Sequence, residues 1–547
     1  MKRIFAIQPM ALITLFVWAS WAAEVSNEAP MRLLQGRHCL FLDEALIASK
    51  QGVTAVMHTP DKRGAVIRPD IPSDGPLIQT RMEPVWCPED KLYRLLYYAY
   101  GNEPGKPTGM ALATSKDGLA WEKPILGLVV LKSSTQNNWI PPVAEHPNNA
   151  IDGVVYDSDE PNPERRFKAL VGAINRRPYG SGDFIHWTPI GASEIPSSDE
   201  SHLALDIERH TFLAMVKTSN EYGRAFGLST STDFEKWTPR RMLFGADAED
   251  QRMAPGVIRR RLGNPAMLGP LFVEPAPGTG AAPGPQPVWR AEVYNIGVFP
   301  YEDIYIGLPS MYYPTGTCLP AKNNTDGFHE IQLAMSRDLT HWTRLGDRKP
   351  FIPPSDTRNG RLGVYDRTQI LAANRPLVKE KELWFYYSGL KWRDDFYALN
   401  PDGTPRDPAT LSSEDKADQQ DGWGAICLAV LRRDGFVSLH AEQEGVIITK
   451  PLVTQGKHLY VNASVKGSIT IEVLGMDGAP LPGYADTDSI PVKTDDVCVP
   501  VRWKSTDVLP DTVPASVIEK EATSDTQSLV RFRIHLKNAD LYALWVE

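Results

Sequence analysis

The chain has few cysteines for its size, and they are scattered. Its 547 residues include five, without the close spacing that metal ligands require: Cys39, Cys87, Cys318, Cys427 and Cys498. An odd number in a large chain argues against a disulfide scaffold, so buried thiols are expected. The sequence also lacks a glycine-rich phosphate loop, a catalytic Cys-His signature and a nucleophile elbow, so no site of those kinds is indicated.

An excess of basic residues is also missing. The 58 Lys and Arg residues are outnumbered by 67 Asp and Glu residues, which gives a net charge of −9. Nucleic-acid binding depends on basic patches, so this balance is a poor match for a nucleic-acid partner. After the first residues, no segment is long and apolar enough to cross a bilayer, and no membrane partner is expected.

The first residues have the three parts of a secretory signal. Lys2 and Arg3 are followed by an apolar run from Ile4 to Ala19 and by small residues at Ala22 and Ala23. The run is short for a membrane span and is broken by proline, which favours cleavage over an uncleaved membrane helix. The sequence therefore predicts a signal peptide at 1–23 and a periplasmic or secreted protein.

A short strip recurs and organises the middle of the chain. Four copies share Ser, Asp and Trp at fixed spacing: Ser115, Asp117 and Trp121; Ser181, Asp183 and Trp187; Ser231, Asp233 and Trp237; Ser336, Asp338 and Trp342. Ser and Asp can bond the backbone of a tight turn, while Trp packs back on the sheet, so each strip predicts a hairpin corner. In a fifth, degraded copy after Asp434, Phe436 replaces Trp.

Five corners, each preceded by alternating strand-like runs, predict an all-β fold: a five-bladed β-propeller followed by a C-terminal β-sandwich. The last strand of blade five is expected at 436–439, and the proline- and glycine-rich run from Glu274 to Pro287 is expected to be a surface loop. The predicted domains are an extended segment packed along the propeller at 31–77, the propeller at 78–442 and the sandwich at 445–547.

Acidic residues stand at the start of each blade's first strand. These strands line the axis of a propeller, so their loops converge on one face. The candidate catalytic residues are Glu83, Asp152, Asp199, Glu200 and Glu292; the candidate substrate-binding residues are Asp70, Arg290, Asp366 and Trp392, with Trp86 and Trp139 as further aromatic candidates for the mouth.

Gathered carboxylates push one another's pKa values apart, so one can stay protonated while another is ionised. Cleavage of a glycosidic bond needs that division of roles. Under the alternative interpretation, each acid only caps a turn or pairs with an arginine such as Arg94, Arg166 or Arg224.

Two segments carry a resemblance to a known group of enzymes. The run from Ile151 to Asp157 and the run from Glu200 to Leu203 resemble strands of the five-bladed propeller glycosidases of glycoside hydrolase families 32 and 43. The match is closer to the family 32-like secreted bacterial proteins. The resemblance implies that Glu200 is the general acid and that Glu83 stands for the blade-one carboxylate, an Asp in those families. Asp199 competes for the acid role, and Glu292 could replace Glu83.

The leading hypothesis is an exported glycoside hydrolase that acts on an oligo- or polysaccharide, possibly a furanoside. The alternatives are a sialidase-like hydrolase, because the strip is close to an Asp-box, and a propeller that binds carbohydrate without catalysis. No cofactor is expected. A structural Ca²⁺ at the acidic axis stays possible, since Ca²⁺ prefers oxygen ligands.

Overall fold

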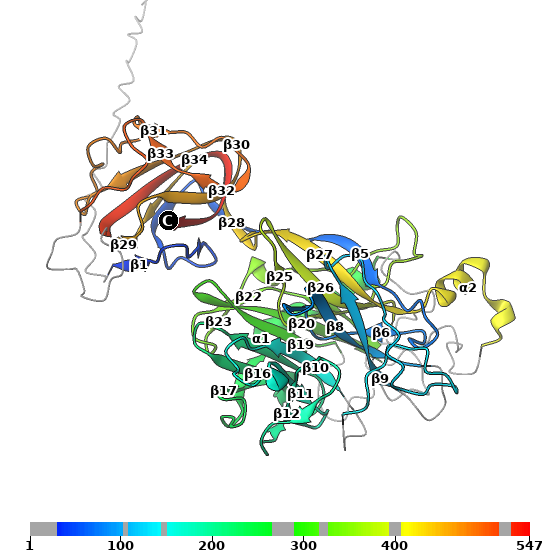
Figure 1. Ribbon diagram of the computed structural model, residues 1–547. Helices are drawn as coiled ribbons and strands as arrows, with labels where there is room; N and C mark the ends of the chain where they lie inside the picture. Colours follow the sequence, from blue (N-terminus) through cyan, green and yellow to red (C-terminus); the bar gives the residue numbers. More distant parts are fainter. Residues whose placement is uncertain are drawn as a thin grey trace, which may run out of the picture.

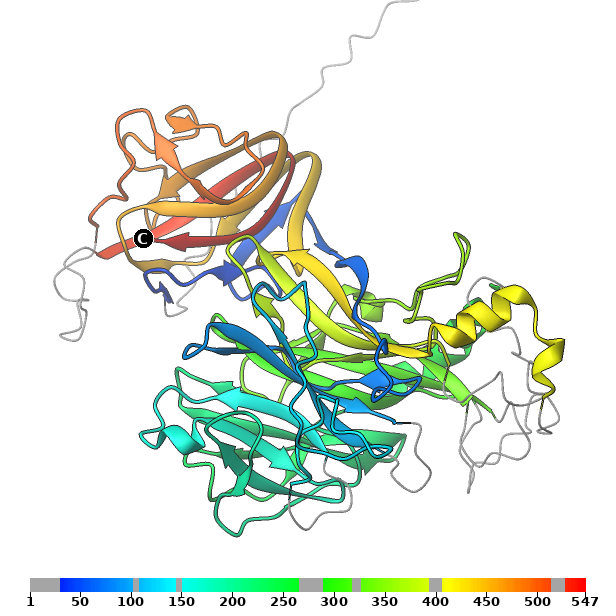
Figure 2. The ribbon, with the colours of Figure 1, turned by 45° about the vertical axis from the view of Figure 1, so that its right-hand side comes forward.

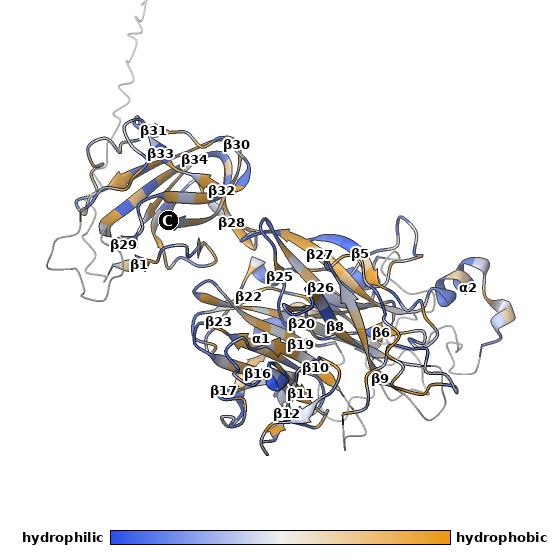
Figure 3. Ribbon diagram, in the orientation of Figure 1, coloured by the Kyte–Doolittle hydropathy of each residue, from blue (hydrophilic) through white to orange (hydrophobic). Residues whose placement is uncertain are grey.

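The computed structural model describes residues 30–101, 108–143, 150–264, 289–316, 326–392, 406–512 and 527–547. Within these ranges the chain forms two β-rich bodies (Figure 1). Apolar and polar residues alternate along the strands of both (Figure 3). The predicted signal peptide at 1–23, Cys318 and the proline-rich stretch at 274–287 lie outside the described residues.

The larger body is a five-bladed β-propeller, which confirms the predicted fold. Inner strands of neighbouring blades contact one another. Blade one contains β6 (Ile78–Gln79), β7 (Val85–Cys87), β8 (Leu92–Ala99) and β9 (Gly109–Ser115); blade two contains β10 (Ile151–Tyr156), β11 (Phe167–Val171), β12 (Asn175–Ser181), β13 (Thr188–Pro189) and β14 (Ile195–Pro196); blade three contains β15 (Ser201–Asp206), β16 (Thr211–Asn220), β17 (Gly223–Ser231) and β18 (Arg241–Gly245). Blade four contains β19 (Glu292–Tyr301), β20 (Ile304–Gly316), β21 (Asp326–Ile331), β22 (Ala334–Ser336) and β23 (Trp342–Arg344); blade five contains β24 (Gln369–Ala372), β25 (Leu377–Val378), β26 (Glu382–Leu390), β27 (Gly424–Arg432) and β5 (Asp61–Ile67).

The outer strand of blade five comes from the start of the chain. β5 pairs antiparallel with β27, and the two strands lie side by side in both views (Figures 1 and 2). The assignment of the predicted strand at 436–439 to blade five is therefore wrong. Residues 437–439 begin β28 (Val437–Thr449), which leaves the propeller and pairs with β4 (Thr54–Met57) and β34 (Gln527–Val546). Phe436 is fully buried against Phe351 and Phe385, so the ring does take the place of the missing Trp.

The hairpin corners form as the strips predict. In the third strip, the Ser231 hydroxyl accepts the backbone N–H of Phe234 at 2.8 Å, and the Asp233 carboxylate accepts those of Glu235 and Lys236. The same bonds recur in the other three copies. The side chains thus satisfy donors that the reversing chain would leave without a partner.

A helix lies in the stretch before the predicted surface loop. α1 (Ala248–Leu262) begins with a capping box between Asp247 and Asp250, which is a sequence signal for the start of a helix. Arg344 and Arg348 from blade four bind Asp250 and hold the helix between blades three and four. A second helix, α2 (Ser413–Gln420), lies in the insertion before β27.

Residues 31–57 join the second body instead of packing along the propeller. That body is one network of nine strands: β1 (Met31–Leu33), β2 (Cys39–Leu40), β3 (Ile47–Gln51), β4, β28, β29 (Leu452–Gln455), β30 (Leu459–Leu474), β32 (Asp496–Pro500) and β34, beside a small sheet of β31 (Ser489–Ile490) and β33 (Arg502–Trp503). Its apolar core is separate from those of the blades. The two-layered sandwich stays a prediction for this domain.

A buried polar cluster joins the two bodies. Asp434, fully buried, accepts hydrogen bonds from Tyr301 at 2.6 Å and Asn462 at 3.1 Å and pairs with His38 at 2.7 Å. Tyr301 and Asp434 belong to the propeller, while His38 and Asn462 belong to the second body. Among the described residues, no helix is long and apolar enough to cross a bilayer.

Removal of the Asp434 carboxylate should weaken the whole protein. We expect Asp434→Ala to lower the free energy of unfolding by about 3–5 kcal/mol, because three buried partners lose their acceptor. Asp303→Ala is the control: Asp303 pairs with Arg337 at the exposed surface, and its loss should cost less than about 1 kcal/mol. Equal losses in urea unfolding of the two variants would contradict the expectation.

Candidate active site

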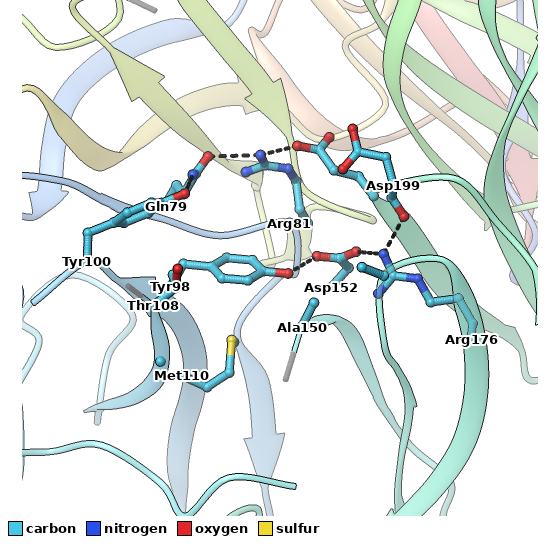
Figure 4. A pocket seen from close by; sticks show the side chains of 13 residues that line it. Gln79, Arg81, Tyr98, Tyr100, Thr108, Met110, Ala150, Asp152, Arg176 and Asp199 are labelled. Carbon is cyan, nitrogen blue, oxygen red and sulfur yellow. Dashed lines mark hydrogen bonds and ion pairs between the residues drawn. The ribbon is translucent and has the colours of Figure 1, made fainter. Parts of the chain in front are cut away.

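A pocket of about 220 Å³ lies where blades one, two and three meet (Figure 4). Carboxylates and arginines face one another across it. The lining residues come from inner strands and their loops: Gln79, Arg81, Tyr98, Tyr100, Thr108, Gly109, Met110, Ala150, Asp152, Ala173, Arg176, Asp199 and Glu200. Three of the predicted catalytic residues, Asp152, Asp199 and Glu200, are thus brought together.

Asp152 forms the buried floor of this pocket. It lies on β10, and its carboxylate accepts hydrogen bonds from the Tyr98 hydroxyl, from Arg176 at 2.6 Å and from the Ser201 backbone N–H at 2.8 Å. Only 1% of the residue is exposed. With its oxygens engaged by three donors, Asp152 is built to hold neighbouring groups in place.

Glu200 is held as an anion. One of its oxygens pairs with Arg81, whose side chain also donates to Gln79 at 2.8 Å, while the other oxygen is 3.5 Å from the Asn295 amide. Burial alone would raise the pKa of Glu200, but the charges of Arg81 and Lys217 outweigh it and hold this pKa at about 2. Glu200 is therefore ionised throughout the neutral range.

Asp199 has the opposite tendency. Its side chain is 53% exposed at the mouth, and its nearest cation is Lys217, with the ammonium 3.8 Å from the carboxylate. Partial burial raises the pKa of Asp199, and the negative charge of Glu200 raises it further. The pKa values of these two adjacent carboxyl groups are thus shifted in opposite directions, which is the pattern of an acid beside an anionic partner.

A break in the blade-one strand delivers Arg81 to the pocket. β6 and β7 both pair with β8, but residues 80–84 between them leave the ladder. Thr80 is instead bonded to Ser388 of blade five, its N–H donating to the Ser388 hydroxyl at 2.7 Å. The departure ends at Pro84, which has no N–H for a ladder bond.

Glu83 lies in the same break but is absent from the pocket lining. The residue is 6% exposed, and its Oε2 atom has no hydrogen-bond partner among the described residues. Burial raises the pKa of Glu83 to about 7, against the opposing charge of Arg375. The structure therefore does not support Glu83 as a residue that touches substrate.

The raised pKa of Glu83 makes stability depend on pH. The folded protein binds this proton more tightly than the unfolded chain, so the stabilisation is complete below about pH 4.5 and is lost as the pH rises through about 7. The shift corresponds to about 3 kcal/mol. We expect Glu83→Gln to flatten this loss in urea unfolding between pH 5 and pH 8. A variant with the wild-type slope would contradict the assignment.

Glu292 and Arg290 pair with each other rather than facing the pocket. Glu292 binds Arg290 and Arg224, each at 2.6 Å, and is 1% exposed. Neither residue lines the pocket. For Glu292 the alternative interpretation, an acid that pairs with Arg224, is the one the structure supports.

The other predicted binding residues also lie away from the pocket lining. Asp70 pairs with Lys123, and Asp366 pairs with Lys62 at 2.8 Å while it accepts from Tyr387. Trp392 is 2% exposed and packs beneath Arg367, so it is a core residue and not a sugar platform. Of the two further candidates, Trp139 is buried and Trp86 is exposed outside the lining.

Sequence reasoning missed the cations of this site. Arg81 lies in the break after β6 and Arg176 lies on β12, but nothing local in the sequence distinguishes them from the half-exposed Arg177. Lys217, on β16, is 3% exposed and donates to the carbonyl of Tyr294. One sequence signal was available for Lys217: it is the single basic residue in an otherwise apolar run, Phe212–Lys217, which indicates a buried lysine.

Two groups of residues in the described part could offer ligand atoms to a metal ion. They are His38, Glu302 and Asp434, and Asp157, Asp159 and His210, with ligand atoms within 4.8 Å of one another. Asp434 is already bonded to protein donors, and Asp157 pairs with Lys168 at 2.6 Å. Neither group includes a pocket residue.

Neither a protein-family model nor a curated protein matches the chain. Solved structures do, including an N-acetylgalactosamine deacetylase from F. plautii (15% identity, 71% of this chain and 97% of the other, TM-score 0.37), the catalytic domain of a GH62 α-L-arabinofuranosidase from Coprinopsis cinerea (11%, 68% and 97%, 0.35) and an exo-β-1,3-galactanase from Phanerochaete chrysosporium (10%, 90% and 99%, 0.31). Similarity at this level assigns no activity to the present chain.

Proposed function

We propose that the protein is a glycoside hydrolase whose reaction takes place at the pocket between blades one, two and three. The observation that carries the proposal is the pair Asp199 and Glu200. These adjacent carboxyl groups have surroundings that raise the pKa of Asp199 and lower the pKa of Glu200. A proton donor beside a fixed anion is what hydrolysis of an acetal between sugars requires.

In this proposal Asp199 is the acid. Its position at the mouth gives it access to the leaving-group oxygen, and its raised pKa keeps the proton available nearer to neutral pH. The resemblance to known propeller glycosidases gave this role to Glu200, but a carboxyl with a pKa of about 2 is a poor donor.

Glu200 supplies negative charge to the reacting carbon. Its Oε1 atom is bound to Arg81, whereas the one hydrogen bond of Oε2 within the described part of the chain is the 3.5 Å contact to Asn295, which leaves Oε2 able to turn to substrate or water. Asp152 acts as a positioning residue: it fixes Tyr98 and Arg176 and anchors the backbone of Ser201, the residue after Glu200.

The test is a hydrolysis screen of the mature protein on arabino-, fructo-, galacto- and xylo-configured oligosaccharides, with release of reducing ends as the measurement. Release from at least one substrate class supports the proposal. Tight binding without release from any substrate would instead identify a carbohydrate-binding propeller.

A further inference from the structure

The charges around the pocket do not balance when Asp199 is protonated. Three cations are buried there: Arg81, Arg176 and Lys217 are each less than 5% exposed. Arg81 is paired with Glu200, and Arg176 is paired with Asp152. For Lys217, the described residues offer one carboxylate within 4 Å, that of Asp199.

Protonation of Asp199, which the acid role requires, therefore leaves three buried cations facing two carboxylates, and Lys217 must share the charge of Glu200 with Arg81. A buried excess of positive charge is unfavourable, so such a site favours the arrival of an anion. Lys217 keeps its bond to the Tyr294 carbonyl, which orients the ammonium but does not neutralise it.

Donors at the pocket floor are also unused. The Nε and Nη1 atoms of Arg176 and the Nε atom of Arg81 find no acceptor among the described residues, although both side chains line the pocket. Figure 4 shows the two guanidinium groups on either side of Asp152, with Arg176 close to Asp199. An arginine with free N–H groups at a pocket floor is suited to a carboxylate or sulfate oxygen.

We propose that the pocket takes an anionic sugar, one that carries a carboxylate or a sulfate ester, with the negative charge held between Arg176 and Asp199. This inference rests on the proposed function, because it assumes that Asp199 holds a proton when substrate binds. The anion then supplies the negative charge that the three buried cations lack and the acceptors that Arg176 lacks.

Binding can be measured without turnover in Asp199→Asn, which imitates the protonated acid. The probes are galacturonic acid oligosaccharides, sulfated galactan oligosaccharides and neutral galactan oligosaccharides of equal length, titrated by calorimetry. We expect at least one anionic series to bind about tenfold or more tightly than the neutral series, with a moderate loss at high salt. The two anionic series distinguish carboxylate from sulfate.

The contribution of Arg176 to the preference for anionic sugars is tested with a variant that removes one positive and one negative charge together. Asp199→Asn combined with Arg176→Gln and Asp152→Asn removes the buried pair as a whole, so no carboxylate is left without a partner. Binding of the anionic series should fall to the level of the neutral series. The control is Arg177→Gln in the same background, because Arg177 is exposed and pairs with Glu194; its anion preference should be unchanged.

Equal binding of anionic and neutral probes by Asp199→Asn, or a preference that survives loss of the Arg176–Asp152 pair, would overturn the inference. These outcomes are separate from the hydrolysis test. A neutral substrate that wild-type protein cleaves as well as its anionic counterpart would refute the anion site and leave the hydrolase standing. Selective anion binding without hydrolysis would do the reverse.

Discussion

Asp199→Asn is expected to lower kcat by about 10²–10⁴-fold on natural oligosaccharides, because the amide cannot donate a proton to the departing oxygen. The loss should be much smaller on nitrophenyl glycosides, whose leaving group departs without protonation. Comparison of kcat on the two substrate types measures the acid role directly.

The matched control for this variant is Asp159→Asn. Asp159 also lies in the propeller but is exposed in blade two, away from the pocket lining. Its replacement should leave kcat on both substrate types unchanged. A similar loss on both substrate types in Asp199→Asn would show that the carboxyl is needed for something other than proton donation.

Glu200→Gln is expected to lower kcat by a similar factor, about 10²–10⁴-fold, because the reacting carbon loses its fixed negative partner. Its residual activity carries a second signature. The Glu200 charge raises the pKa of Asp199, so removal of that charge lowers the pKa. The alkaline limb of the pH–rate profile, where the acid loses its proton, should therefore move to lower pH.

That shift separates a catalytic role from a structural one. Replacement of Glu200 also leaves Arg81 buried beside a neutral amide, so some loss of stability is expected and should be measured by thermal unfolding. An alkaline limb that stays in place, or moves to higher pH, would mean that Asp199 and Glu200 are not coupled as described.

The regular parts of the fold could be predicted because they depend on local chemistry. The strips at Ser115, Ser181, Ser231 and Ser336 bond their own turns, so four corners follow from seven residues each. The outer strand of blade five could not be predicted in this way. β5 and its partner β27 lie at opposite ends of the propeller sequence, and nothing in the sequence of either strand identifies the other strand as its partner.

The same limit applies to the candidate site. Position along the chain placed Asp152, Asp199 and Glu200 correctly at a shared pocket, because inner strands of successive blades must converge. The same reasoning from position also predicted Glu292 as a catalytic residue. In the structure, however, its carboxylate forms a buried ion pair with Arg224, which is distant in the sequence. Which acids line the pocket depends on how side chains from different blades lie relative to one another, and a sequence does not show those distances.

The early pairing of β1 to β5 with late strands has a consequence for how the polypeptide is made and cut. Residues 31–67 are synthesised well before their partners at 424–432 and 437–547. The propeller cannot close until β27 has been made, the second body cannot close until β34 has been made, and long-range pairing of this kind is slow. An expression fragment that begins at residue 31 and stops near residue 436 would leave β1 to β4 without their partner strands. The propeller is continuous from β5 to β27, whereas isolation of the second body requires co-expression of its two pieces or circular permutation.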